Sequence, residues 1–226
     1  MKNLKSAFTL AEVLVTLGII GVVSAMTIPT LVQNYQRESY VTQLHKVYNE
    51  LSQATQRALH DTNAVSLAET RYNESNNNAA SDFLHTYFNI VNDCGASLTP
   101  CFANQYNRIN GEEADVSISD AFADKTTVVA LASGASICMF GGFDNDDDDY
   151  HGYTQVMIDI NGAKGPNITG RDIFLFEIYS DGKIDVSYEG GSKNSDRDDL
   201  IDGCRASGYG EHCTTLILQD NWRMTY

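Results

Sequence analysis

The sequence predicts an α+β fold in which a long N-terminal hydrophobic helix packs by its C-terminal half on an antiparallel β-sheet of four or five strands. Two patterns lead to this prediction. A stretch without any charged residue, 13–32, is followed by helical periodicity up to about residue 60. After residue 126, segments rich in β-branched and aromatic residues alternate with turn residues. A chain of 226 residues can bury one sizeable core, so we expect one globular domain carried on one long helix.

The apolar segment 8–31 is long enough to cross a membrane. As a helix it would rise about 1.5 Å per residue, to roughly 36 Å, against a hydrocarbon core of about 30 Å. Glu12 lies one turn inside this segment, where an unpaired carboxylate deep in lipid costs about 2.5–3.5 kcal/mol. A positive group at the same depth would offset this cost. Cleavage between Ala7 and Phe8 would supply one as a new amino terminus.

The first thirty residues resemble the start of type IV pilins and of type II secretion pseudopilins. The shared features are Lys2 and Lys5 in a short leader, Ala7, Phe8-Thr9-Leu10-Ala11-Glu12, and the apolar tract from Gly21 to Pro29. The resemblance implies that a prepilin peptidase cuts before Phe8, that the new amine is N-methylated, and that Glu12 pairs with the amine of a neighbouring subunit. Gly21 would permit close approach of helices, and Pro29 falls on the family's helix-breaking proline. Ala7 departs from the pattern, because that residue is usually Gly.

The resemblance implies a structural subunit of a bacterial type II secretion or type IV pilus-like filament. Its partners would be the prepilin peptidase, other copies or related pilin-like subunits, the inner membrane and the assembly platform in that membrane. The leader lysines favour a cytoplasmic amino end, so the chain after this single span would lie in the periplasm or beyond it. One alternative is a minor tip pilin that binds a surface, a secreted substrate or DNA. Another is a tethered or secreted domain outside any filament, such as one released by signal peptidase after Ala25.

Composition and motifs argue against two other classes of function. The formal net charge is −15, whereas affinity for nucleic acid comes chiefly from Lys and Arg, so DNA is not an expected partner of this subunit. The sequence contains no G-x-S-x-G, H-E-x-x-H or Gly-rich phosphate loop, and its five histidines are scattered. Glu211-His212 beside Cys213 is the only tight group of this kind. We therefore expect a protein that is not an enzyme and requires no cofactor.

The predicted organisation has five parts. These are a cleaved leader at 1–7, a transmembrane or filament-core helix at 8–32, its amphipathic continuation at 33–60, a variable helix and loop region at 61–125, and the sheet with a disulfide region at 126–226. Pro29 predicts a kinked or loosened turn, after which the helix resumes. The stripe that this continuation would bury consists of Val41, Leu44, Tyr48, Leu51, Thr55 and Ala58.

The later elements are predicted from local patterns. Residues 75–80 form a polar loop, and the apolar residues from Phe83 to Val91 suggest a short helix ending near Cys94. Asp181-Gly182 predicts a hairpin turn. The tail from residue 213 favours a short helix whose Trp222 closes the core. The expected strands are 126–132, 135–140, 154–160, 173–180 and 183–188.

The five cysteines fit an oxidising compartment. Cys94 and Cys101 are separated by a short loop, and so are Cys204 and Cys213, so each pair could close as a local disulfide. Reduced or cross-paired cysteines are the alternative. Cys138 lies in an apolar run, where a buried, inert thiol is expected.

Two acidic segments are candidate cation sites. Asp159, Asn161 and Asp172, together with loop carbonyls, could supply the six to eight oxygens that calcium prefers, although their spacing is not that of an EF-hand. The alternative is that Asp159 and Asn161 cap a turn with their own side chains. The acidic run from Asp144 to Asp149 is expected to be a solvated loop, with weak cation binding or a basic partner as alternatives.

Overall fold

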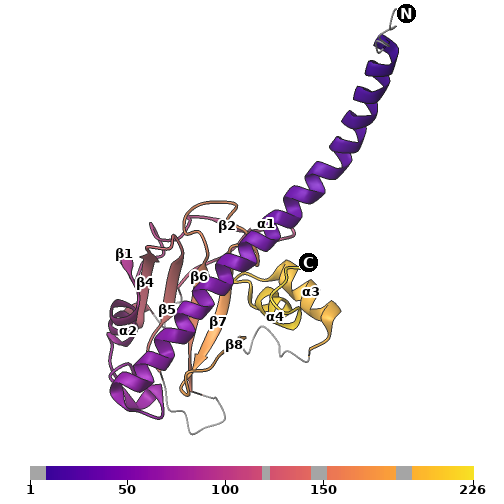
Figure 1. Cartoon of the computed structure of the whole chain (residues 1–226). Coiled ribbons are helices and arrows are strands. Elements are labelled where there is room, and N and C mark those ends of the chain that lie inside the picture. Colours follow the sequence, from indigo (N-terminus) through magenta and orange to yellow (C-terminus); the bar gives the residue numbers. More distant parts are fainter. Residues whose placement is uncertain (1–8, 119–122, 144–151, 187–194) are drawn as a thin grey trace, which may run out of the picture. The chain divides into compact units, whose positions relative to one another are not determined.

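A computed structural model describes residues 9–118, 123–143, 152–186 and 195–226 and contains two compact units, Met1–Ser39 and Tyr40–Tyr226. Helix α1, Leu10–Thr62, contributes to both units (Figure 1). The helix continues through Pro29, where the sequence predicted a loosened turn. A proline removes one backbone hydrogen bond. The helical turns before and after Pro29 continue without a break.

The second unit is built on one six-stranded antiparallel sheet in the order β1-β4-β5-β6-β7-β8 (Figure 1). The predicted α+β class is confirmed, with one strand more than expected. The strands are β1 (Ile90–Gly95), β4 (Thr126–Leu131), β5 (Ser136–Phe140), β6 (Tyr153–Asp159), β7 (Ile173–Tyr179) and β8 (Ile184–Val186). A separate two-stranded ribbon consists of β2 (Tyr106–Asn107) and β3 (Glu113–Ala114). Short 3₁₀ helices lie at Leu67–Glu69 and Ala123–Lys125.

The additional strand is β1, which the sequence analysis assigned wrongly to the end of a helix. Helix α2, Ala79–Tyr87, starts inside the predicted loop and ends before the predicted helix does. Phe88 is already extended, with φ −118° and ψ 151°. The next residues pair with β4 in an irregular antiparallel ladder. Pairing with the neighbouring strand thus decides the conformation of a segment whose local pattern is ambiguous.

The two faces of the sheet are both covered. Alternate strand residues, among them Val129, Ile158 and Phe176, belong to the main core together with α1 and α2. The intervening residues form a cross-strand row of Val128, Cys138, Met157 and Leu175. This row packs against Phe102 and Tyr106 from the segment between β1 and β4. Burial on both faces explains why these strands read as nearly continuous apolar runs.

Residues from Tyr40 onward attach α1 to the sheet along one stripe. The buried residues of the helix are Val41, Leu44, Val47, Leu51, Ala54, Thr55 and Ala58. Two polar contacts complement this packing: Tyr48 Oη donates to the carbonyl of Ile184 at 3.3 Å, and Thr55 Oγ1 donates to that of Gly182 at 3.1 Å. Gly182, at φ +84°, lies in the predicted β7–β8 hairpin turn. The turn therefore places a backbone acceptor against α1.

The C-terminal region forms two short helices joined by a disulfide. Helix α3, Arg197–Ala206, and helix α4, Glu211–Gln219, are linked by Cys204–Cys213. The tail then returns to α1, where the Trp222 ring stacks on His45 with centroids 4.1 Å apart. Trp222 packs on the main core, as predicted for the residue that closes it.

Leu51→Ala should lower the free energy of unfolding by about 2–5 kcal/mol, because it opens a cavity where α1 meets the sheet. Leu51 is 0% exposed. Equilibrium denaturation in urea measures the change, and Gln53→Ala, at an exposed position two residues along the same helix, is the control. Equal stability of the two variants would contradict this account of the core.

Candidate functional site

The N-terminal motif is only partly within the described residues. The leader, Ala7 and Phe8 lie outside them, and so does the acidic run from Asp144 to Asp149. Of the residues predicted to act in assembly, Glu12, Gly21 and Pro29 all lie on α1. A Cβ built on Gly21 would meet no atom within 4 Å, so this position leaves room for another helix to approach.

Glu12 closes a reciprocal hydrogen-bonded cap at the start of α1. Its Oε2 accepts from the amide nitrogen and from the hydroxyl of Thr9, both at 2.8 Å. Thr9 Oγ1 in turn accepts from the amide of Glu12 at 3.3 Å. This is a capping box, and its T-x-x-E spacing is visible in the sequence, although this role of Thr9 was not predicted. The box supplies two neutral donors to the carboxylate and itself contributes no positive charge.

The helical surface that follows the cap is apolar and exposed. The large hydrophobic side chains of α1 that are at least 44% exposed are Leu10, Val13, Leu14, Val15, Leu17, Ile19, Ile20, Val22, Val23, Met26, Ile28, Leu31, Val32 and Tyr35. Within the described residues, α1 is the one helix long and apolar enough to cross a membrane. A surface of this size favours burial in lipid or against other apolar helices.

The three residues predicted to bind calcium take part in hydrogen bonds within the protein. Asp159 accepts from the Tyr106 hydroxyl and, at 3.0 Å, from the amide of Asn161. Asp172 accepts from the amides of Asn167 and Ile168, each at 2.6 Å. No group of three or more His, Cys, Asp or Glu side chains suited to a metal occurs among the described residues. These contacts match the alternative prediction, in which the side chains stabilise their own loops, and calcium at this position has no support.

Burial changes the titration of both acids. Asp159 and Asp172 are 0% exposed. Desolvation raises the pKa of Asp159 to about 8, against the opposing effect of the Tyr106 hydrogen bond and with a further increase from the nearby charge of Asp172. Desolvation also raises the pKa of Asp172 to about 6, although its two backbone donors favour the charged form. Both acids therefore retain protons in the folded chain at pH values where an exposed Asp has released them.

The cysteines occupy two kinds of site. The pairs expected from the sequence form the disulfides Cys94–Cys101 and Cys204–Cys213. Cys138 is a free thiol with 0% exposure, and desolvation raises its pKa. A buried thiol with a raised pKa holds little thiolate and is unreactive.

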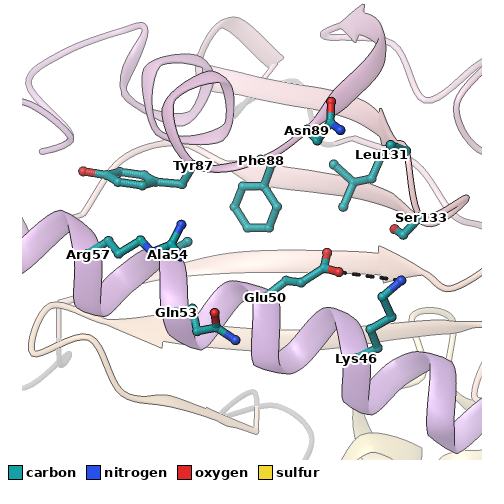
Figure 2. Close-up of a pocket in the computed structure, with 11 residues that line it drawn as sticks. Lys46, Glu50, Gln53, Ala54, Arg57, Tyr87, Phe88, Asn89, Leu131 and Ser133 are labelled. Atoms are coloured by element: carbon teal, nitrogen blue, oxygen red, sulfur yellow. Dashed lines mark ion pairs between the residues drawn. The ribbon is translucent and has the colours of Figure 1, made fainter.

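An open groove of about 390 Å³ separates α1 from the segment that joins α2 to β1 (Figure 2). Phe88 points toward the helix, and Lys46 and Glu50 on the helix form an ion pair at 3.9 Å. Arg57 lies on the same helix, on the side of Tyr87. The Lys46–Glu50 pair is largely exposed, so it contributes little to stability.

Comparison with known families covers nearly the whole chain. The model of a family of unknown function (DUF6613) matches residues 30–226. The chain belongs to this family. A second model, the prokaryotic N-terminal methylation motif, matches residues 2–28. No curated protein and no solved structure matched.

The methylation motif and the long apolar helix make this DUF6613 member a type IV pilin-like protein, as the N-terminal residues predicted. The two family matches meet within α1, close to Pro29. The DUF6613 region thus contains the entire second unit, including both disulfides and the two buried acids.

Thermal stability should fall as the pH rises from about 4 to 8. The folded state binds protons at Asp159 and Asp172 that the unfolded chain, with Asp pKa values near 3.9, has already released. Their contribution is thus complete below about pH 4 and is lost as the pH passes about 6 and then about 8. Melting temperatures across this range measure the effect.

Asp159→Asn keeps the side-chain shape and removes one of the two titrations, so its melting temperature should vary less with pH. Asp202→Asn, at an exposed acid on α3, is the matched control and should follow the wild type. An unchanged pH profile in Asp159→Asn would exclude this carboxyl as the titrating group.

Proposed function

We propose that the chain is a structural subunit, a pseudopilin or pilin, of a bacterial filament of the type II secretion or type IV pilus kind. A prepilin peptidase cuts before Phe8. The mature subunit then remains in the inner membrane, with its second unit on the periplasmic side, until it is assembled. An assembly platform in that membrane then adds subunits to the filament. The observation that carries the proposal is the acid Glu12 directly before the uncharged stretch 13–32, within a region whose residues 2–28 match the methylation motif.

The contacts of Glu12 support a role in assembly. Thr9 satisfies hydrogen-bonding capacity but brings no positive charge. In a dry filament core, an amine at the same depth would therefore add a Coulomb attraction that the capping box lacks, and this attraction is stronger at low dielectric. The amine of Phe8 in a neighbouring subunit would pair with Glu12 and set the register of each added subunit.

The contrast between the two parts of α1 supports burial by other subunits. Residues from Val41 onward bury their apolar stripe within the chain's own second unit. Apolar side chains such as Leu14, Ile20 and Met26 remain exposed. Lipid can cover them before assembly and the helices of other subunits afterwards. Gly21 would allow such helices to approach closely.

The mature protein should begin at Phe8 and carry a methyl group on its amino terminus. Mass spectrometry of the N-terminal peptide from the native host measures both features. In a strain without prepilin peptidase the peptide should begin at Met1 or Lys2. A mature terminus at Met26 would instead identify an ordinary secreted domain.

Glu12→Ala should leave cleavage before Phe8 largely intact and reduce incorporation into filaments at least tenfold. The reason is that the Phe8 amine of the neighbouring subunit, buried in the filament core, loses its counter-charge. Immunoblots of sheared filament fractions against whole-cell protein measure the ratio. Glu38→Ala removes an acid from the same helix outside the apolar segment and should assemble normally. Normal assembly of Glu12→Ala would refute the charge-pairing role.

A further inference from the structure

A second hollow, of about 540 Å³, lies between two loops of the second unit. One loop precedes and includes β2, at residues 100–107, and the other follows β6, at residues 163–167. We call this hollow the amide pocket, because its polar side chains are the carboxamides of Asn104, Gln105, Asn107 and Asn167. Its volume falls within the range of about 300–1,000 Å³ typical of small-molecule sites.

The carboxamides of the amide pocket have unused hydrogen-bonding capacity. Within the described part of the chain, the side chains of Asn104, Gln105 and Asn107 have no hydrogen-bond partner. The Oδ1 atom of Asn167 is enclosed and is likewise without a partner. An enclosed acceptor without a donor is costly, and Asn167 Oδ1 is the one atom of this kind at the hollow. The other three carboxamides are exposed, so each is free to exchange water for the polar groups of a ligand.

The two loops are held rigidly enough to form the pocket before a ligand arrives. The amide of Asn107 donates to the carbonyl of Asn167 at 2.9 Å, and its carbonyl accepts from Thr169 at 2.9 Å. The amide of Asn167 also donates to the carboxylate of Asp172 at 2.6 Å. The Tyr106 hydroxyl donates a hydrogen bond to buried Asp159 and accepts one from the amide of Ala103 at 3.1 Å. Because these contacts order the loops in advance, a ligand loses less free energy to ordering them.

We propose that the amide pocket binds a neutral carbohydrate. A sugar hydroxyl both donates and accepts a hydrogen bond, and a carboxamide offers both functions in return. Pro100, Ala103, Ala163 and Pro166 provide apolar patches for the C–H faces of a sugar ring. No ionisable side chain lines the pocket within the described residues, and the net charge of −15 repels anions.

An extended peptide fits the amide pocket less well. Peptides that bind to strands do so chiefly through backbone hydrogen bonds to an open edge. At this pocket the backbone of Asn107 is already paired on both its amide and its carbonyl. The backbone of Asn107 is therefore closed to an added strand, whereas its side chain and those of Asn104 and Gln105 can serve the hydroxyl groups of a compact ring. This proposal goes beyond the filament function and does not depend on it.

The test uses the full chain in lauryldimethylamine oxide, a detergent without a sugar head group, and isothermal titration calorimetry. The probes are cellotriose and chitotriose as neutral saccharides, trigalacturonate as their charged counterpart, and trialanine as a peptide. At least one neutral trisaccharide should bind with a Kd below about 1 mM. It should bind at least about tenfold more tightly than trigalacturonate.

The double variant Asn104→Ala/Asn107→Ala should weaken this binding by about tenfold or more, through the loss of two hydrogen bonds. Both positions are exposed, so the melting temperature should not change. Asn89→Ala removes an exposed carboxamide from the groove of Figure 2 and is the matched control. Glu12→Ala should bind the saccharide normally, which separates this proposal from the filament function.

Three results would overturn the carbohydrate assignment. One is the absence of binding by both neutral trisaccharides. Another is tighter binding of trialanine or trigalacturonate than of the neutral probes. The third is unchanged saccharide affinity in the double variant, which would place the binding elsewhere on the protein.

Discussion

The packing of one helical stripe on one face of the sheet is the interaction on which the second unit depends. Leu44, Leu51 and Ala58 are completely buried there, in the same core as Phe174 and Phe176. Because strand side chains alternate, this assignment fixes which residues face away from the helix. The loops between β1 and β4 must then cover that opposite face. The amide pocket lies where part of this segment, residues 100–107, meets the loop after β6.

Helix α1 has two surfaces of different kinds along one continuous element. Its later turns are amphipathic, with Lys46 and Gln53 on the side away from the buried stripe. Its earlier turns are apolar all round, which is typical of a helix surrounded by lipid or by other helices. At the start of that apolar stretch lies the charged carboxylate of Glu12, which accepts a hydrogen bond from Thr9. The candidate membrane span and the stripe that packs on the sheet thus occupy separate lengths of the same helix.

The sequence predicts those elements whose signal is local. The apolar runs that become β4 to β8, and the hairpin at Asp181-Gly182, were recognisable from strand composition and turn residues. Strand β1 was not, because Asn92 and Asp93 are exposed on an edge and only pairing with β4 makes the segment extended. The amide pocket was equally hidden. Asn104 and Asn167 are distant in sequence, and contacts such as that between Asp172 and the amide of Asn167 become apparent only in the folded chain.

The two disulfides join cysteines only seven and nine positions apart. Closing such small rings costs little chain entropy, so correct partners meet without help from distant parts of the protein. The fifth thiol, Cys138, is withdrawn into the middle of the sheet and offers no competing partner once folding is complete. Each pair can therefore close locally, and the folded protein exposes no free thiol that could exchange with either bond.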